Sequence, residues 1–284
     1  IIGLTYRGCT KLNSSGSVLF SRSSEANNSS DSVSFSYITL DPSDNIYMAG
    51  MYFDDSEYND REEYNIVRKL SSSGTTQLTK TYRSSDRGGS YANGIAYSSH
   101  QSGVMVSNTT YDDSSSRQRH TVTSNDASDG DFIRSTYNKY WISGDTTQNG
   151  ELYGGPIAVG STGNVYSTMS TGSSVTLLKL ETTGVGIVWQ RARGTSGAQQ
   201  TYPSAIALDA DENIYYLEQD NPYIGSPVGR VYRVNIVKMN SSGELQWVRR
   251  IWNGNYDVFA TSLTIDSLGD LIITGYTELN NSYI

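Results

Sequence analysis

Several features that would simplify an assignment are scarce in this chain. Cys9 is the single cysteine among 284 residues, so disulfides do not hold the fold together. No run of 18 apolar residues occurs, which excludes a membrane-spanning helix. The amino terminus, Ile1–Leu4, is too short for a signal peptide and lacks an initiating Met. We therefore expect either a processed chain or a section of a longer one.

Positive charge is also scarce. The chain has 21 Lys and Arg against 29 Asp and Glu, which gives a net charge of −8. An acidic surface repels phosphate backbones, so we expect no nucleic-acid partner, and we expect no membrane insertion. A hydrophobic content of 36% is low for one large core, whereas 22 Tyr and 4 Trp are too many for a disordered chain. Many thin sheets with exposed polar loops would reconcile the two observations.

One stretch recurs five times. Each copy has bulky apolar residues on either side of a small one, and the clearest copies continue into an Asp-x-x-Gly-Asn type of turn. The copies begin near Ile38, Ile95, Ile157, Ile206 and Leu263 and are spaced 49 to 62 residues apart. The pattern predicts a strand buried on both faces that leads through a tight turn into a second strand. Asp44 and Glu212 replace the turn Gly, so we expect backbone strain at these two residues.

A second stretch, Lys-Leu-x-x-x-Gly or a close variant, alternates with the first. Its copies begin at Lys11, Lys69, Lys179 and Lys238, and a degenerate copy covers Asn125–Gly130. A bulky apolar residue and then a basic one usually follow, as in Trp189 and Arg191. This stretch also predicts a β-hairpin.

Two hairpins per repeat give four strands, named a, b, c and d, and repeats of this size predict an all-β fold of the β-propeller type. We expect a single domain over residues 1–284 with five four-stranded blades. The ring would close by pairing the N-terminal c and d strands, Thr10–Arg22, with the C-terminal a and b strands, Leu263–Thr277. The alternative is a section of a longer chain whose ring holds more blades.

The copies Ile206–Tyr215 and Asn235–Arg249 carry a family resemblance. They resemble the bacterial SBBP-type β-propeller repeat, a relative of NHL repeats. The second and third repeats depart from it, because His100-Gln101 alters one turn and residues 111–130 lack a clean Lys-Leu stretch. The resemblance implies a secreted scaffold, similar to phage tail-fibre and virion structural proteins, with no shared catalytic residues.

The strand order places the a–b and c–d turns on one face and the b–c and d–a loops on the other. The loops predicted there are long and variable, and they cover residues 23–34, 51–64, 111–119, 218–229 and 252–261. Function usually resides in such loops on a rigid frame. We expect their aromatic residues either to bind a ligand or to support the loops, namely Tyr52, Phe53, Tyr58, Tyr111, Tyr223, Trp252 and Tyr256.

Few residues of the sequence favour a metal site or a catalytic site. Asp54, Asp55 and Glu57 form a weak Ca²⁺ candidate, since such a charge run is more often a solvated surface, and we expect no other cofactor. The two histidines of the chain, His100 and His120, support neither a histidine-based triad nor a metal cluster. A glycosidase needs two facing carboxylates. The residues just before the inner strands are not acidic: Tyr37, Gly94, Pro156, Ala205 and Ser262.

Three hypotheses follow. The first is a non-catalytic recognition domain of an extracellular assembly, such as a phage tail fibre or virion, that binds a surface glycan or protein and contacts other subunits. The second is a free-standing, secreted, lectin-like propeller. The third is a glycosidase, which would require a carboxylate pair on the long loops.

Overall fold

The computed structural model describes most of the chain and contains only β-strands there. The described residues are 1–5, 8–23, 32–54, 62–82, 89–112, 117–126, 152–182, 186–194, 198–223, 231–252 and 256–279. Over these ranges no helix has the length and apolar character needed to cross a membrane. The chain divides into two compact units, Ile1–Trp141 and Ile142–Ile284.

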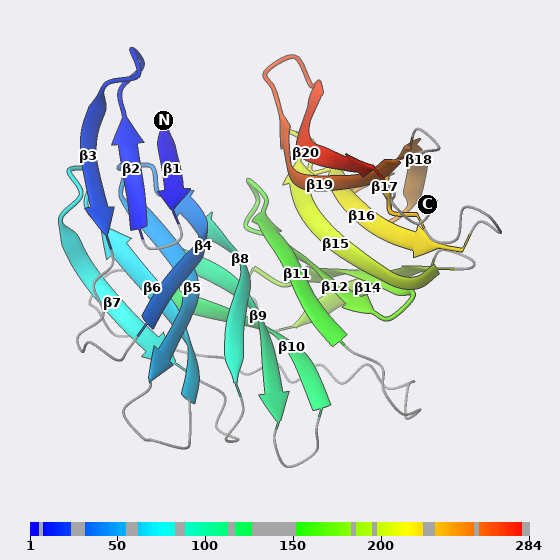
Figure 1. Ribbon diagram of the computed structural model, residues 1–284, viewed down its shortest axis with the longest axis horizontal. Coiled ribbons are helices and arrows are strands. Elements are labelled where there is room, and N and C mark those ends of the chain that lie inside the picture. Colours follow the sequence, from blue (N-terminus) through cyan, green and yellow to red (C-terminus); the bar gives the residue numbers. More distant parts are fainter. Residues whose placement is uncertain are drawn as a thin grey trace. The chain divides into compact units, whose positions relative to one another are not determined.

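The first unit holds three antiparallel sheets (Figure 1). The first sheet has the order β1-β2-β3, with strands Ile2–Thr5, Gly8–Leu12 and Val18–Ser23. The second has the order β4-β5-β6-β7, with strands Ser32–Leu40, Ile46–Asp54, Glu62–Leu70 and Thr76–Tyr82. The third has the order β8-β9-β10, with strands Ser90–Ser98, Gly103–Asp112 and Arg117–Asp126.

The second unit also holds three antiparallel sheets. The first has the order β11-β12-β13-β14, with strands Leu152–Val159, Val165–Thr171, Ser174–Leu180 and Ile187–Gly194. The second has the order β15-β16-β17-β18, with strands Ala198–Leu208, Ile214–Pro222, Arg233–Met239 and Leu245–Ile251. The third is the hairpin β19-β20, with strands Tyr256–Ile265 and Leu271–Leu279.

The repeated hairpins are confirmed. Leu40 pairs with Ile46, Leu208 with Ile214, and the remaining first-type hairpins follow the same antiparallel pattern. Three sheets run from a to d in sequence order, as the two-hairpin repeat requires. Asp44 and Glu212 have φ values of 62° and 58°, so the backbone strain predicted at these two turns is present.

The turn motif is held by its own side chains. One oxygen of Asp41 accepts hydrogen bonds from the backbone N–H groups of Ser43 and Asn45, each at 2.9 Å. Its other oxygen accepts bonds from Asn45 Nδ2 at 2.8 Å and from the Tyr47 hydroxyl at 3.2 Å. Asp209, Asn213 and Tyr215 repeat the arrangement. The recurring Asp, Asn and Tyr are therefore structural, and each turn leads into the buried second strand of its sheet, β5 or β16.

The recurring basic residues connect consecutive sheets. In the first unit Lys11 donates to the carbonyl of Ser72 at 3.1 Å, and Arg22 Nε donates to the carbonyl of Gly74 at 2.9 Å. In the second unit Arg191 Nε donates to the carbonyl of Gly243 at 3.2 Å. Each contact runs from one second-type hairpin to the turn of the next. These turns therefore gather at one end of each unit's sheets, which we name the turn end, and the opposite end is the loop end.

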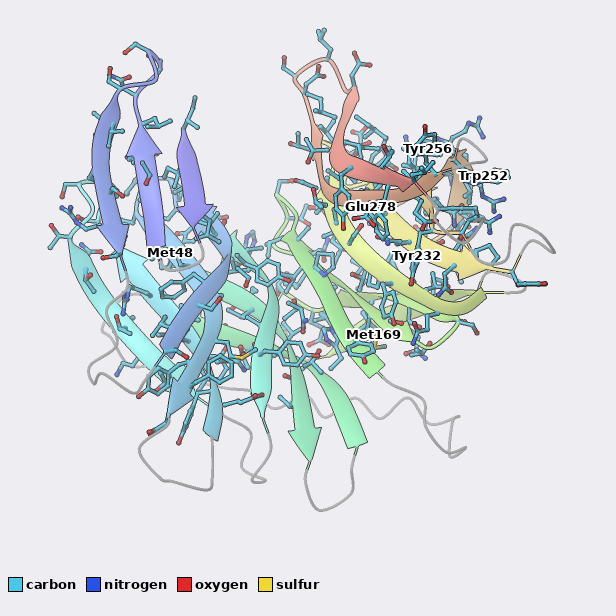
Figure 2. All side chains as sticks on the ribbon, in the orientation of Figure 1. Met48, Met169, Tyr232, Trp252, Tyr256 and Glu278 are labelled. Atoms are coloured by element: carbon cyan, nitrogen blue, oxygen red, sulfur yellow. The ribbon has the colours of Figure 1, made fainter. Side chains whose placement is uncertain are left out.

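Apolar clusters fill the spaces between neighbouring sheets. In the first unit Ile46, Met48 and Ile66 of the second sheet pack against Cys9 and Phe20 of the first (Met48 is labelled in Figure 2). In the second unit two such clusters cover opposite faces of the β15–β18 sheet. One joins it to the β11–β14 sheet through Tyr166, Leu177, Tyr216 and Val237. The other joins it to the β19–β20 hairpin through Leu217, Val234, Val258, Ala260 and Leu263.

The N-terminal hairpin differs from the prediction. Strand β1 was not expected, yet it pairs with β2 through Ile2–Lys11 and Leu4–Cys9, and Ile2 and Leu4 pack on the apolar cluster. Because β3 occupies the other edge of β2, both edges of β2 are taken. The expected ring closure would pair the C-terminal a–b hairpin with β2. In the structure β2 pairs with β1 and β3 instead.

The strands also extend further toward the loop end than the sequence indicated. Strand β5 continues through Met51–Asp54 and β16 through Glu218–Pro222, residues that were predicted to lie in loops. Each inner strand likewise begins five to eight residues before its repeat, and each carries a β-bulge just before the apolar motif. The loop between β12 and β13 is only Gly172–Ser173, so not every loop at this end is long.

Candidate functional site: the loop end of the β15–β18 sheet

The loop end of the β15–β18 sheet carries a buried charged layer. Successive side chains of a strand alternate between faces, so Glu218 and Asp220 share the face of β16 that carries Tyr216. That face packs against the β11–β14 sheet. The layer therefore continues the apolar cluster toward the loop end. We name its members the charged cluster: Arg193, Glu218, Asp220, Arg233, Asn235 and Arg250.

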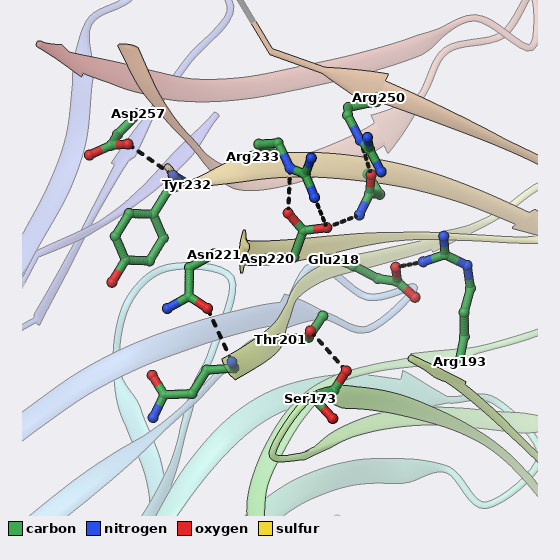
Figure 3. Close-up of polar contacts among 12 residues, drawn as sticks. Ser173, Arg193, Thr201, Glu218, Asp220, Asn221, Tyr232, Arg233, Arg250 and Asp257 are labelled. Atoms are coloured by element: carbon green, nitrogen blue, oxygen red, sulfur yellow. Dashed lines mark hydrogen bonds and ion pairs between the residues drawn. The ribbon is translucent and has the colours of Figure 1, made fainter. Parts of the chain in front are cut away.

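Asp220 lies at the centre of the cluster (Figure 3). Arg233 donates to both of its oxygens, at 2.8 Å from Nε and 3.2 Å from Nη2. Asn235 Nδ2 donates to the same carboxylate at 2.8 Å. The cross-strand register explains the match, because Asp220 stands opposite Arg233 and Glu218 opposite Asn235. A buried carboxylate with a bidentate Arg and an amide donor is well satisfied.

Two further arginines complete the cluster. Arg193, from strand β14 of the neighbouring sheet, forms an ion pair with the buried Glu218. Arg250, on β18 opposite Asn235, donates from Nε to Asn235 Oδ1 at 3.0 Å. The Glu218 Oε1 and the Tyr216 hydroxyl are buried and have no hydrogen-bond partner within the described part of the chain. Burial raises the pKa of the Tyr216 hydroxyl, although the nearby Arg193 opposes this shift.

A second polar group joins the same end of the sheet to its neighbours. Thr201 on β15 donates to the Ser173 carbonyl at 3.1 Å, which holds the short β12–β13 loop against the sheet. Asn221 accepts a bond from the Gln200 backbone N–H at 3.1 Å. Asp257 on β19 accepts a bond from the Tyr232 backbone N–H at 2.9 Å. These contacts fix the strand ends that support the loops.

Three of the predicted aromatic residues lie at this end and are solvent-accessible. Tyr223 directly follows β16 and is 59% exposed. Trp252 directly follows β18 and is 41% exposed, and Tyr256 begins β19 and is 40% exposed. Figure 2 labels Trp252 and Tyr256 in the second unit. The exposed aromatics and the buried charged layer thus lie at the same end of the sheet. The aromatics were predicted there from the sequence, and the charged layer was not.

The predicted loop over residues 51–64 contributes less. Tyr52 and Phe53 lie on strand β5, and Tyr52 packs against the apolar cluster of the first unit and against the Tyr64 ring at 5.8 Å. This corrects their placement in a loop. Tyr58, Asp55 and Glu57 lie outside the described residues, and Asp54 is at the end of β5. Over the part of the chain that is described, no group of three metal-binding side chains occurs.

Tyr111 lies on strand β9, one residue before its end, and not in a loop. His120, on β10, is buried, and its Nδ1 lies 3.1 Å from the Asn108 carbonyl. Burial lowers the pKa of the His120 imidazole to about 4, against a weaker opposing effect of the Asn108 hydrogen bond. A neutral, enclosed imidazole of this kind is a packed core residue.

Sequence analysis missed the charged cluster entirely. Its carboxylates were assigned to a loop, and its arginines were not connected with them. A signal was present: Tyr216, Glu218 and Asp220 alternate on one strand, and Arg233 and Asn235 alternate on the next. A polar row in register across two adjacent strands indicates a buried charge-paired layer.

Comparison with known proteins identifies the fold. No family model matches the chain, and no curated protein matches its sequence. A solved structure described as the Dos1 propeller is 10% identical, with a TM-score of 0.51, over 95% of this chain and 60% of its own. An endo-arabinase from Bacteroides thetaiotaomicron is 13% identical, with a TM-score of 0.44, over 87% of this chain and 93% of its own. An endo-1,4-β-xylanase from the same organism is 10% identical, with a TM-score of 0.45, over 85% and 94%.

This chain therefore spans about 60% of the length of the Dos1 structure. The repeated antiparallel sheets, together with that similarity, show that the chain has the β-propeller fold. At these identities the similarity concerns the fold alone.

Proposed function

We propose that the chain is a non-catalytic recognition scaffold that binds a surface glycan or protein through the loop end of its sheets. The observation that carries the proposal is the exposure of Tyr223, Trp252 and Tyr256 at the same end of the β15–β18 sheet as a charge-paired layer. Flat aromatic rings with polar edges suit contact with sugar rings and with protein surfaces. A rigid support reduces the ordering cost of binding.

The two ends of the sheets differ in a way that favours this assignment. At the turn end the recurring Asp, Asn, Lys and Arg are engaged in contacts within and between turns. Residues engaged in this way hold the sheets together. At the loop end the sequence differs from one repeat to the next. Tyr223, Trp252 and Tyr256 are exposed there, whereas the polar groups of the strand ends are hydrogen-bonded to one another.

The carboxylates of the charged cluster support a binding role rather than glycoside hydrolysis. A general acid must come within hydrogen-bond reach of the group that it protonates. Asp220 accepts a bidentate bond from Arg233, and Glu218 is paired with Arg193, so both carboxylates are engaged within the protein. Both carboxylates are also buried.

The biological setting of the proposal rests on the repeat. Its resemblance to SBBP and NHL repeats, and to phage fibre propellers, leads us to place the chain in an extracellular or virion assembly with other subunits. A free-standing lectin-like protein would use the same loop end without such partners. Repeated copies in a fibre would convert weak single sites into strong overall binding.

The test is a binding screen against immobilised surface polysaccharides and surface proteins. Tyr223→Ala and Trp252→Ala are expected to weaken binding at least about tenfold, as is typical of aromatic anchors. Leu268→Ala is the matched control, because Leu268 is an 85% exposed apolar residue in the turn between β19 and β20. Binding that persists in both aromatic variants and falls in the control would contradict the proposal. Release of reducing sugar by the wild type would support the glycosidase instead.

A further inference from the structure

The charged cluster contains one more cation than it has carboxylates. Glu218 is paired with Arg193 and Asp220 with Arg233. Among the described residues no carboxylate pairs with Arg250, whose hydrogen bond goes to the neutral amide of Asn235. A chain with a net charge of −8 thus places three arginines, from two neighbouring sheets, in one cluster. The third of them is available to an anion from outside.

Arg250 is held in position for such a partner. Asn235 is buried, and its amide nitrogen is bonded to Asp220, so its Oδ1 is a fixed acceptor for Arg250 Nε. Arg250 is solvent-exposed, and its two terminal nitrogens, Nη1 and Nη2, take no part in this bond. Two parallel N–H donors at one edge of a guanidinium match the two oxygens of a carboxylate.

Arg250 lies near two other guanidinium groups, those of Arg233 and Arg193. Partial burial lowers the pKa of its guanidinium, and the neighbouring Arg233 and Arg193 lower it further, against the opposing effect of Asp220. The neighbouring arginines therefore disfavour a third positive charge here. A bound anion would relieve this repulsion, because an opposite charge stabilises each of the three guanidinium groups.

The chain continues from this cation to an exposed aromatic residue. Trp252 follows Arg250 by two residues, and continuing the register of Ile251 with Val234 would place it opposite Arg233. It is 41% exposed. A sugar ring can stack on an indole while a carboxylate on that ring reaches an arginine, so the two side chains together suit an acidic sugar better than a neutral one.

We propose that Arg250 and Trp252 bind a saccharide that carries a carboxylate. The inference rests on the proposed recognition function and names the ligand class for it. Arg250 forms the bidentate ion pair with the carboxylate, and Trp252 stacks on the sugar ring. Arg233 and Arg193 remain paired with Asp220 and Glu218, so Arg250 is the guanidinium of the cluster that is left for the ligand.

The experiment compares a carboxylated oligosaccharide with its own uncharged derivative. Oligogalacturonate and its methyl ester are titrated into the full chain by calorimetry. The acid is expected to bind, and the ester is expected to bind at least about tenfold more weakly, since esterification removes a charge-assisted pair. Arg250→Gln should reduce binding of the acid about tenfold to hundredfold and leave binding of the ester unchanged. Arg250→Lys should fall between the two, because it keeps the charge and loses the fork.

Arg249→Gln is the matched control. Arg249 is the adjacent exposed cation, and it lies over the Trp247 ring on the opposite face of β18, so the acid should bind this variant within about twofold of wild type. Thermal unfolding of each variant establishes that a loss of binding is not a loss of fold.

The outcomes separate the two proposals. Equal binding of acid and ester, with both lost in Trp252→Ala, would overturn the acidic-sugar inference and leave the recognition function intact. Tight binding of the acid that is insensitive to Arg250→Gln would also overturn it. Binding of polyglutamate in place of either sugar would assign the site to an acidic peptide and refute the saccharide. Failure of every probe and of the wider screen would count against the recognition function itself.

Discussion

Replacing Glu212 by Gln is expected to lower the free energy of unfolding at pH 7 by about 2 to 3 kcal/mol, a large effect for a residue in a surface turn. The reason lies in the preceding repeat, where Gly160 replaces the turn Asp. Glu212 supplies the missing carboxylate from the next turn. It accepts bonds from Thr162 N at 2.8 Å and Thr162 Oγ1 at 2.5 Å, from Asn164 Nδ2 at 2.9 Å and from the Tyr166 hydroxyl at 3.2 Å.

The magnitude follows from the pKa of this carboxyl group. Burial alone would raise the pKa, but the hydrogen bonds from Asn164, Thr162 and Tyr166 lower it from 4.5 to about 2. At about 1.4 kcal/mol for each pKa unit, the ionised form contributes at most about 3 kcal/mol. Because the folded-state pKa lies below the unfolded value, this stability is fully present above about pH 4.5 and is lost as the pH falls toward 2.

The assay is urea unfolding at several pH values, followed by tryptophan fluorescence. The difference between wild type and Glu212→Gln should be constant from pH 7 to pH 5 and should shrink below pH 4.5. Asp211→Asn is the control, because Asp211 is an exposed carboxylate in the same turn, and it should change stability by less than about 0.5 kcal/mol. A loss in Glu212→Gln no larger than that of the control would refute the reasoning.

A double substitution tests the same arrangement from the other side. Gly160→Asp alone should destabilise, because a side chain there would collide with the Glu212 carboxylate. Glu212→Gly alone relieves a positive φ, a gain of about 1 kcal/mol, but leaves the donors of the preceding turn without their acceptor. Together they should recreate the turn of Asp41 and Asp209 and return stability to within about 1 kcal/mol of wild type. Additive losses would show that the two turns are not coupled.

Two further predictions concern stability. Arg191→Ala should lower the free energy of unfolding by about 1 to 2 kcal/mol in urea unfolding, because it removes the bond to the next turn and the contact over the Trp189 ring at 5.4 Å. Arg249→Ala, which loses an equivalent ring contact, should lose less, and equal losses would argue against the inter-sheet bond. His120 is neutral when folded, with a pKa of about 4, so wild type should lose about 2 to 3 kcal/mol as the pH falls from 6.5 to 4. His120→Gln should flatten that dependence in the same assay, and an unchanged slope would assign it to other groups.

The sequence was sufficient to predict the turn end of the fold. Asp41, Asn45 and Tyr47 act within one hairpin, so their spacing along the chain reports their contacts directly. The backbone strain at Asp44 and Glu212 was predictable for the same reason, since a turn that needs φ > 0 carries its requirement locally. What could not be predicted is that the Glu212 side chain serves another turn. Its partners lie about 50 residues earlier and share no local pattern with it.

The strand extensions were missed because of the β-bulges. In β4 the buried residues are Val33 and Phe35 before the bulge, and Ile38 follows it, so the alternation changes phase by one residue. A search for strict alternation starts at Ile38 and assigns the preceding residues to a loop. The same shift occurs in β19, where Val258 and Ala260 precede the bulge and Leu263 follows.

The charged cluster was missed for a different reason: polar residues in a strand were taken as loop residues. Glu218 and Asp220 are as buried as the apolar residues before them, and their burial is possible only because arginines and Asn235 lie opposite or adjacent. Single-sequence patterns of hydrophobicity do not register such compensation. Cross-strand matching of opposite charges at the ends of apolar strands would have detected it.

The two ends of the sheets use the same interactions for different purposes. At the turn end Lys11, Arg22, Lys179 and Arg191 each donate to a backbone carbonyl of the next turn, an acceptor that any sequence provides. Such contacts can repeat without change while the rest of the blade varies. At the loop end Asp220 binds Arg233 and Glu218 binds Arg193 through side chains, so the arrangement depends on these particular residues. The contacts at the turn end stabilise the sheets. The loop end of one sheet can therefore carry an arginine, Arg250, without a carboxylate partner among the described residues. We expect recognition to reside where a blade departs from the repeat in this way.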